Sequence, residues 1–286
     1  MRVLITGSNG QLGSELVARY TARGDAVFGF DLPDIDITDP ASVAAAFEIA
    51  KPEVVINCAA WTAVDAAEEN EEGAHLVNGV GAEVLARACA ASDAWMVQIS
   101  TDYVFSGDAT LPYREESAPN PRSAYGRTKL EGEIAMRDEL KGRYYIVRTA
   151  WLYGMNGSNF VKTMMRLEKE HETVRVVDDQ FGQPTFAADL AMQIMALVDA
   201  HPPSGIFHAT NSGSVSWHGF TQEIFRLIGA DPDRVIAVTS EEFIRPAPRP
   251  AYSVLSHGAW EKVGLSPMRD WREAIADAVA QGISPN

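Results

Sequence analysis

A tyrosine and a lysine that could take part in proton transfer stand four residues apart in the segment SAYGRTKLEGE, residues 123–133. On an α-helix this spacing places Tyr125 and Lys129 on one face, about 6 Å apart along the axis. In an isolated pair of this type the tyrosine usually packs and the lysine is solvated. The pair therefore gains meaning only if other parts of the chain supply the remaining groups of a reaction.

Thr101 supplies a third group, because it follows an apolar run in the segment QISTDYVF. Reduction of a ketone needs a hydride from a nicotinamide and a proton for the new alkoxide. A tyrosine can donate that proton if its pKa falls from about 10 towards 7, a change of roughly 4 kcal/mol. An ammonium about 4 Å away contributes about 4 kcal/mol at an effective dielectric constant of about 20. We therefore predict that Tyr125 donates the proton, that Lys129 assists it and reaches the nicotinamide ribose, and that Thr101 holds the substrate oxygen.

A glycine-rich turn near the N-terminus predicts where the nicotinamide cofactor binds. The segment TGSNGQLG places Gly7, Gly10 and Gly13 three residues apart, after an apolar strand and before an amphipathic helix. Glycines there allow a tight turn and a close approach of the backbone to a pyrophosphate at the helix N-terminus. A purely structural turn is the alternative. The loop's other candidate contacts to the cofactor are Asn9, Gln11 and Leu12.

Asp31 ends the apolar run VFGFD, where a carboxylate can accept hydrogen bonds from an adenosine ribose. It would repel a 2′-phosphate, and neither SNGQ before it nor LPDID after it contains Arg or Lys. The sequence therefore favours NADH over NADPH. A capping role for Asp31, or a cation supplied by Arg2 or a distant loop, is the alternative. Further candidates at the cofactor are Asp36 and Ile37 beside the adenine, and Ala59, Ala60 and Trp61 after the third strand.

The elements that would position these residues alternate between short apolar strands and helices. The expected strands are 2–6, 26–30, 54–58, 95–100 and 144–149, and the expected helices are 11–23, 40–50, 74–91 and 123–140. Asp39 as N-cap with Pro40 at the first position marks the second helix. Continuous Val and Ile runs indicate strands buried on both faces. We predict an α/β fold with a Rossmann-like doubly wound parallel sheet in residues 1–153 and a smaller mixed α/β substrate lobe in 154–286, from which some segments return to the sheet.

Composition excludes several classes of protein. The chain has 286 residues, of which 46% are hydrophobic and 22% are charged, and its formal net charge is −15. That charge argues against binding of nucleic acid, whose phosphates need Lys and Arg. No apolar run approaches the roughly 20 residues that cross a bilayer, and the N-terminus resembles no signal peptide, so we expect a cytoplasmic protein. The two cysteines, Cys58 and Cys89, stand in small or apolar surroundings without metal-ligand spacing and are expected to be structural.

The chain resembles the bacterial dTDP-4-dehydrorhamnose reductases of the extended short-chain dehydrogenase/reductase superfamily. The shared segments follow the family's order over nearly the whole chain: TGSNGQLG, NCAAWTAVDAAE, STDYVF, YGRTKLEGE, VRTAWLYG, NFVKTM, DDQFGQPT and PRPAYSVL. The resemblance implies reduction of the 4-keto group of dTDP-4-dehydro-L-rhamnose by NADH or NADPH. The product, dTDP-L-rhamnose, serves cell-surface polysaccharide synthesis.

The resemblance also assigns roles to residues. It makes Tyr125 the proton donor, Lys129 its helper and Thr101 its hydroxyl partner. The positions that it implies at the sugar nucleotide are Asp102, Trp151, Asn159, Phe160 and Lys162, with Arg249 on the diphosphate. Core packing of Trp151, and solvated charges at Lys162 and Arg249, are the alternatives.

Some family members form dimers through Mg²⁺ held by glutamates, and Glu15 matches one of these. The position of a second ligand is Ala188, so we expect no such metal bridge and leave a homodimer open. A dehydratase of the superfamily typically carries Thr-Asp-Glu where this chain has Thr101, Asp102 and Tyr103. The alternatives that stay open are an epimerase, a reductase that gives the other C4 epimer, and a non-catalytic regulatory relative.

Overall fold

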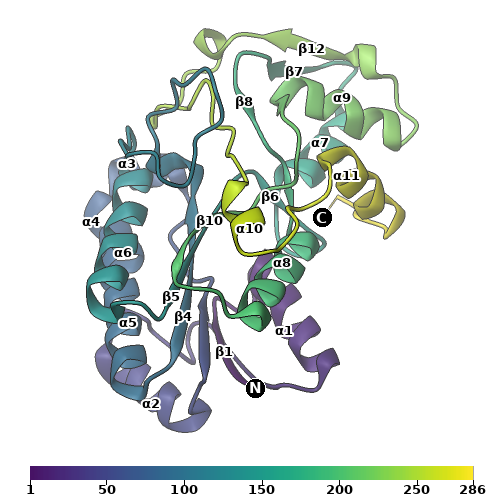
Figure 1. Cartoon of the computed structure of the whole chain (residues 1–286). Coiled ribbons are helices and arrows are strands. Elements are labelled where there is room, and N and C mark those ends of the chain that lie inside the picture. Colours follow the sequence, from purple (N-terminus) through teal and green to yellow (C-terminus); the bar gives the residue numbers. More distant parts are fainter. Residues whose placement is uncertain (286) are drawn as a thin grey trace.

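A parallel sheet of six strands forms the centre of the computed structural model, which describes residues 1–285 (Figure 1). The strands are β1 (Arg2–Thr6), β2 (Ala26–Phe30), β3 (Val54–Asn57), β4 (Trp95–Thr101), β5 (Tyr144–Thr149) and β10 (Gly205–His208). Their order across the sheet is β10-β5-β4-β3-β1-β2. The five expected strands are all present, two of their ends are displaced by one residue, and the Rossmann-like fold is confirmed.

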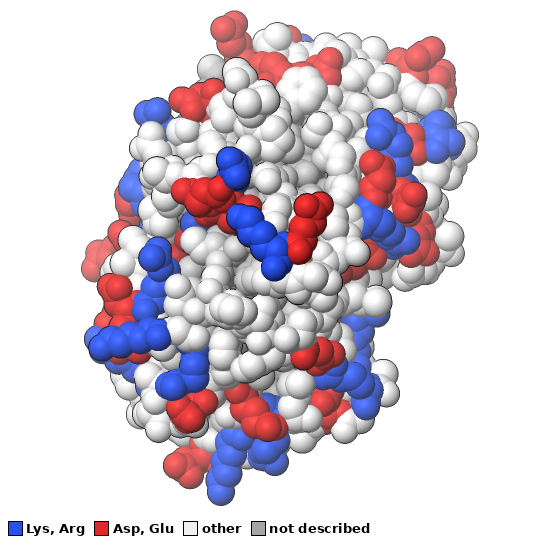
Figure 2. All heavy atoms as spheres, in the orientation of Figure 1, with Lys and Arg blue, Asp and Glu red and all other residues white. Residues whose placement is uncertain are grey.

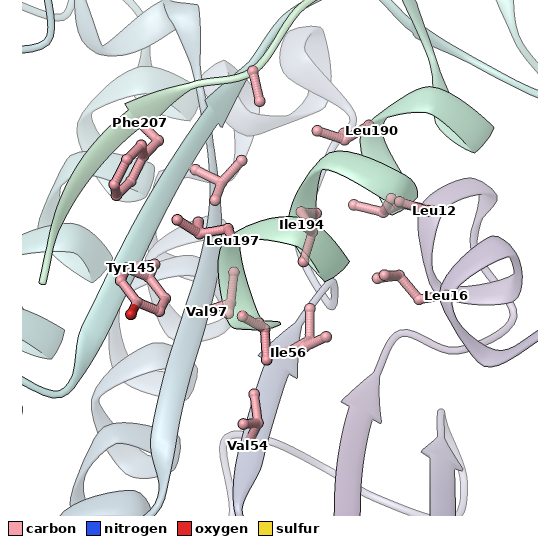
Figure 3. Packing of buried hydrophobic residues seen from close by; sticks show 14 of the residues in the cluster. Leu12, Leu16, Val54, Ile56, Val97, Tyr145, Leu190, Ile194, Leu197 and Phe207 are labelled. Atoms are coloured by element: carbon pink, nitrogen blue, oxygen red, sulfur yellow. The ribbon is translucent and has the colours of Figure 1, made fainter. Parts of the chain in front are cut away.

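Helices cover both faces of this sheet, because successive strand residues point to opposite sides. On one side, Val3 and Ile5 pack with residues of α1 (Gln11–Arg23), α8 (Ala187–Ala200) and α10 (Gly258–Lys262). Figure 3 shows Leu12 and Leu16 of α1 and Leu190, Ile194 and Leu197 of α8 facing the strand residues Val54, Ile56 and Val97. On the other side, Leu4 packs with residues of α2 (Pro40–Ala50), α5 (Gly81–Ser92) and α6 (Ala124–Leu140).

A ladder of buried polar side chains joins the three central strands. Thr6 Oγ1 donates to Asn57 Oδ1 at 2.6 Å, and Asn57 Nδ2 donates to Gln98 Oε1 at 2.8 Å. These residues are directly opposite one another in the strand registers. Since a shift of one residue would leave buried polar atoms unpaired, the ladder fixes the relative heights of the strand ends.

The helix expected over residues 74–91 differs from the structure. Instead, α4 (Glu71–His75) leads into a π-helical turn, η1 (Leu76–Val80), before α5 begins, and an unpredicted helix, α3 (Val64–Glu69), precedes them. Buried Asn78 lies in the π-turn, where its side chain accepts from Trp61 N and donates to Trp61 O and Thr128 Oγ1. The π-turn therefore directs an amide towards the loop after β3. For the helix over 40–50, the expected cap is confirmed, because Asp39 accepts from Ala41 N at 2.9 Å.

The second half of the chain builds a smaller lobe beyond the carboxyl ends of the strands, at the top of Figure 1. Its elements are β6 (Leu152–Tyr153), α7 (Phe160–Glu170), β7 (Val174–Val177), β8 (Phe181–Gly182), β9 (Thr185–Phe186), β11 (Val215–Ser216), α9 (Trp217–Leu227), β12 (Val235–Val238) and α11 (Trp271–Ala280). Three two-stranded pairs, β6–β9, β7–β12 and β8–β11, accompany them. Between these segments, α8 and β10 join the first sheet and its core. The division of the chain at residues 153 and 154 stays a prediction.

Charges of both signs are interspersed over the face in Figure 2, and that face shows no broad basic area. Within residues 1–285, no helix is both long enough and apolar enough to span a membrane.

Candidate active site

A cleft of about 730 Å³ lies at the carboxyl edge of the sheet. The predicted site residues that line it are Gly7, Gly10, Gln11, Leu12, Gly13, Asp31, Asp36, Ile37, Ala59, Ala60, Thr101, Asp102, Tyr125, Lys129 and Trp151. Those that do not line it are Asn9, Trp61, Asn159, Phe160, Lys162 and Arg249. Open parallel sheets bind ligands at this edge, so the topology brings together segments that are distant in sequence.

The glycine-rich loop packs so closely that side chains are excluded. Gly7 has a φ of +63°, and a Cβ there would lie 2.7 Å from Ala59 N. A Cβ on Gly13 would lie 2.1 Å from Gly7 O. Gly10 is the N-cap of α1 and donates its backbone N–H to Gly7 O at 3.0 Å. This tight turn at a helix N-terminus fits the pyrophosphate of a dinucleotide.

Asp31 turns its carboxylate towards this loop. Its Oδ2 accepts from Asn9 N at 3.1 Å, and its Oδ1 accepts from Leu32 N at 2.9 Å. Asn9 therefore does not line the cleft itself, but its backbone N–H binds Asp31, which does. Arg2 lies at the opposite end of β1, where Nε donates to Ala50 O at 2.7 Å, so it supplies no cation near Asp31.

Tyr125 stands in the first turn of α6, whose N-cap Ser123 accepts from Gly126 N at 3.1 Å. The pKa of the Tyr125 phenol is raised to about 12 by burial, which outweighs the opposite effect of its hydrogen bond with Thr101. The sequence predicts that Lys129 lowers this pKa towards 7, and that prediction is wrong, because the loss of solvent around the buried phenol has the larger effect.

Lys129 is nearly enclosed, with 3% of the residue exposed. Its Nζ donates to the carbonyl of Ile99 at 2.6 Å, so the ammonium is fixed to β4 one turn along α6 from Tyr125. Burial lowers the pKa of Lys129 to about 8, and Glu133 and Cys58 oppose that shift. The ammonium therefore loses its proton in a range where enzymes operate.

Asp102 is buried directly beside the reacting groups. Its Oδ1 accepts from Thr101 Oγ1 at 2.9 Å. Burial raises the pKa of its carboxyl to about 6, and the nearby hydroxyls of Ser253 and Thr101 oppose the shift. A buried carboxyl that faces a cleft can bind a hydroxyl of a sugar.

Trp151 lies on the substrate side with a φ of 47°, a conformation unusual for an aromatic residue. Its ring stacks on that of Trp217, with centroids 3.5 Å apart and an angle of 11° between the planes. Both tryptophans line the cleft. The sequence analysis missed Trp217, although its place after the N-cap Ser216 in SVSWHGF marks the start of a helix.

The remaining substrate candidates lie behind the cleft wall. Asn159 caps α7 by accepting from Lys162 N at 3.1 Å, and its Nδ2 donates to Gln11 Oε1 at 3.1 Å. Lys162 Nζ donates to Met155 O at 2.8 Å. Phe160 packs against Trp217, with ring centroids 4.3 Å apart. Of these contacts, the one between Asn159 and Gln11 joins the second lobe to the start of α1.

Arg249 is held by a carboxylate of the first half of the chain. Its Nη2 donates to Asp65 Oδ2 at 2.8 Å, and its Nη1 donates to Ala247 O at 3.1 Å. A diphosphate at Arg249 would therefore have to compete with Asp65.

The metal prediction concerned Glu15 and Ala188. Glu15 pairs with Arg19 at 3.4 Å, and Ala188 is buried in the core of the second lobe. Residues 1–285 contain no group of three or more His, Cys, Asp or Glu side chains that could hold a metal ion. The doubt about Mg²⁺ stays a prediction. Burial raises the pKa of both cysteine thiols, that of Cys58 to about 12.

Residues 1–283 match the family model described as the RmlD substrate binding domain. The chain is 50% identical to the dTDP-4-dehydrorhamnose reductase of Streptomyces griseus over 281 residues, which cover 97% of this chain and 92% of the relative. It is 48% identical to the dTDP-4-keto-6-deoxy-D-glucose reductase of Streptomyces niveus over 277 residues, covering 97% and 96%. The crystal structure of the dTDP-4-dehydrorhamnose reductase of Bacillus anthracis in complex with NADP superposes with a TM-score of 0.95 at 40% identity, covering 98% of this chain and 99% of that one.

Proposed function

We propose, because the chain belongs to the family described as the RmlD substrate binding domain, that it reduces the 4-keto group of dTDP-4-dehydro-L-rhamnose to give dTDP-L-rhamnose. The reductant is a nicotinamide dinucleotide. The observation that carries the proposal is one cleft that holds the glycine-rich turn at one end and Thr101, Tyr125 and Lys129 at the other.

The reaction needs a hydride at C4 and a proton at the oxygen. The nicotinamide, when bound, supplies the hydride. Tyr125 supplies the proton from its phenol, which keeps that proton at neutral pH because its pKa is about 12. An alkoxide is the anion of an acid about as weak as water, whose pKa is roughly 16. The transfer is therefore favourable without a lowered pKa at Tyr125, and the hydrogen bond with Thr101 orients the phenol.

Lys129 contributes a positive charge near the forming oxyanion. Its fixed contact with Ile99 O holds the ammonium at the cleft, where it can also bind the hydroxyls of the nicotinamide ribose. For the sugar nucleotide, we assign Asp102 to a sugar hydroxyl and the stacked pair Trp151 and Trp217 to the side of the ligand that faces the second lobe. Arg249 is assigned to the diphosphate, which would displace the guanidinium from Asp65.

Turnover of the 4-keto-L-sugar nucleotide tests this proposal. With NADH or NADPH present, we expect the nicotinamide absorbance at 340 nm to fall stoichiometrically with the ketone, and NMR of the product to show the rhamno configuration at C4. An epimerase would recycle its cofactor without net oxidation. A regulatory relative would bind the cofactor and leave the ketone unchanged.

A second candidate is a 4-ketoreductase for a different dTDP-keto-6-deoxysugar. It is favoured by the Streptomyces niveus relative, whose identity to this chain, 48%, is nearly that of the Streptomyces griseus relative. The same assay with the D-configured 4-keto-6-deoxyglucose nucleotide separates the two candidates. A kcat/KM higher for that substrate than for the L-sugar would favour the second.

We further propose that the enzyme prefers NADH. Of the residues within 1–285 that line the cleft, Lys129 is the one cation, and it lies at the catalytic end. The adenosine end contains the carboxylates Asp31 and Asp36 instead. A carboxylate facing a 2′-phosphate disfavours NADPH by about 1 to 3 kcal/mol, a factor of roughly 5 to 150. The relative from Bacillus anthracis was crystallised in complex with NADP, so the proposed preference rests on Asp31 and Asp36 of this chain and not on the cofactor of that relative.

Asp31→Ala should reduce the preference for NADH in kcat/KM by a factor within that range. Because Asp31 also accepts from Asn9 N, Asp31→Asn is the matched control: it removes the charge and keeps an acceptor for the loop. We expect Asp31→Asn to lower the ratio of kcat/KM for NADH to kcat/KM for NADPH, while the affinity for NADH stays near that of the wild type. A wild type that favours NADPH, or a ratio unmoved by both substitutions, contradicts the assignment of Asp31 to the ribose.

A further inference from the structure

A buried ion pair lies one helical turn behind Lys129, outside the cleft. On β5, Arg148 donates to both carboxylate oxygens of Glu133 on α6, with distances of 2.9 Å from Nε to Oε1 and 2.7 Å from Nη2 to Oε2. Only 2% of the Arg148 side chain and 3% of the Glu133 side chain are exposed. The guanidinium also lies over the Phe105 ring, 5.0 Å from its centroid. Since packed apolar side chains are often as stable as a buried ion pair, stability alone does not account for it.

Glu133 ties the helix that carries Lys129 to the two strands that end at the cleft. Lys129 and Glu133 are four residues apart and share one face of α6. Ser100, the residue before Thr101 on β4, donates to Glu133 Oε1 at 2.5 Å. Ser100 also lies opposite Arg148 in the register of β4 and β5. The carboxylate therefore fixes the height of the helix relative to both strand ends.

Glu133 is also the negative charge of a buried cluster that contains two cations. The groups that act on the pKa of Lys129, besides its burial, are Glu133 and the thiol of Cys58, the residue after β3. Burial raises the pKa of that thiol to about 12, so it is neutral at pH 7. On the far side, burial and the charge of Arg148 lower the pKa of His208 on β10 to about 3, so its imidazole is neutral as well. The carboxylate thus offsets one of the two positive charges of the cluster.

We propose that Glu133 is a positioning residue for the reduction: held by Arg148 and Ser100, its carboxylate keeps the ammonium of Lys129 charged and in place at the cleft. Lys129 touches the reacting groups, and Glu133 acts through it. This inference rests on the proposed function for its kinetic consequences, whereas its effect on the charge of Lys129 does not depend on the substrate.

Replacing Glu133 by a neutral residue should move the titration of Lys129 to lower pH. The pKa of Lys129, about 8, includes a contribution from Glu133 that favours the charged form. A unit charge one helical turn away in a partly screened site corresponds to about one pH unit or more. We therefore expect Glu133→Gln to shift the alkaline limb of the kcat/KM profile downwards by about one unit or more, so that activity at pH 8 falls more than activity at pH 6.5.

Glu133→Gln leaves Arg148 buried without its partner and is expected to destabilise the protein, so a second variant is needed. Glu133→Gln/Arg148→Met removes both charges and replaces the pair with packed neutral side chains. It should fold, and its net effect on Lys129 should be a smaller shift in the same direction, because removal of the Arg148 cation from β5 partly offsets the loss of the Glu133 carboxylate, which shares α6 with Lys129. Asp277→Asn is the control for lost stability, since it breaks an ion pair with Arg269 in the second lobe at 2.8 Å and should leave the alkaline limb unmoved.

The ¹³Cε chemical shift of Lys129, followed by NMR against pH, reads its charge directly. A midpoint lowered in the folded Glu133 variants supports the inference, including when no keto sugar is turned over and the proposed function has failed. A midpoint and an alkaline limb equal to those of the wild type overturn it. Failure of both variants to fold also overturns it, because the pair would then serve folding and not the placement of Lys129.

Discussion

Tyr125→Phe lowers kcat/KM for the keto sugar by about 10² or more, the contribution of a general acid, while NADH binds as in the wild type. The substitution removes the proton donor and leaves the ring. That ring packs against Ala67, Ala74 and Ala124, and lies edge-on to Tyr103 with centroids 5.6 Å apart. Since these contacts do not use the hydroxyl, the fold should be unchanged, and loss of activity reports on proton transfer.

Tyr145→Phe is the matched control for removing a tyrosine hydroxyl. Tyr145 belongs to β5 and packs in the core beside Trp95 and Phe207; its OH donates to Pro202 O at 2.7 Å, and it does not line the cleft. We expect it to reduce thermal stability slightly and to leave kcat/KM near that of the wild type. Isothermal titration with NADH and steady-state kinetics measure both variants. Near-normal turnover by Tyr125→Phe would require another proton donor.

The parallel sheet was predictable because its strands are buried on both faces. Runs such as VVIN in β3 and YYIVRT in β5 have no alternation of polar and apolar residues, which is typical of strands covered by helices on each side. Once the order of strands and helices follows, the carboxyl ends of the strands meet at one edge. That is why the sequence alone assigns Gly7, Asp31 and Thr101 to the same edge of the sheet.

The electrostatics of the cleft could not be predicted in the same way. The spacing of Tyr125 and Lys129 places both on one helix face, but burial depends on what β4 and the second lobe cover. Burial raises the pKa of the Tyr125 phenol and lowers that of the Lys129 ammonium, because it disfavours the charged form of each group. The spacing of two residues indicates how strongly their charges interact, but it does not indicate how far burial shifts their pKa values.

Partners that are distant in sequence were also missed. Arg249 pairs with Asp65, and Trp151 stacks on Trp217, although no local pattern connects these positions. The π-turn around Asn78 has a related cause, because its buried amide contacts the backbone of Trp61 and the hydroxyl of Thr128. Such contacts decide local geometry through tertiary packing, which helical periodicity does not describe.

Gly13→Ala should remove most of the affinity for NADH while the fold is retained. A Cβ at this position would lie 2.1 Å from Gly7 O and 2.8 Å from Ser8 Cα, so the first turn of α1 must move away from the loop. Such overpacking costs about 1–3 kcal/mol. If overpacking raises the free energy of the cofactor-bound state by about 3 kcal/mol more than that of the free protein, the dissociation constant of NADH rises about 10²-fold. The measurement is the rise in Tm caused by one fixed, excess concentration of NADH, because a ligand specific for the native state raises stability with the logarithm of its affinity.

Two other glycines provide controls of graded severity for Gly13→Ala. A Cβ on Gly10 would lie 3.2 Å from Gly7 O, a contact that a shift of a few tenths of an ångström relieves, so Gly10→Ala should weaken NADH binding far less. A Cβ on Gly205 in β10 would lie 3.7 Å from the Phe207 ring, which is an ordinary van der Waals contact. Gly205→Ala should therefore leave the NADH-induced rise in Tm unchanged. The order of effects, Gly13 over Gly10 over Gly205, follows from these distances alone. An NADH-induced rise in Gly13→Ala equal to that of Gly205→Ala would mean that the pyrophosphate does not lie on the turn between β1 and α1.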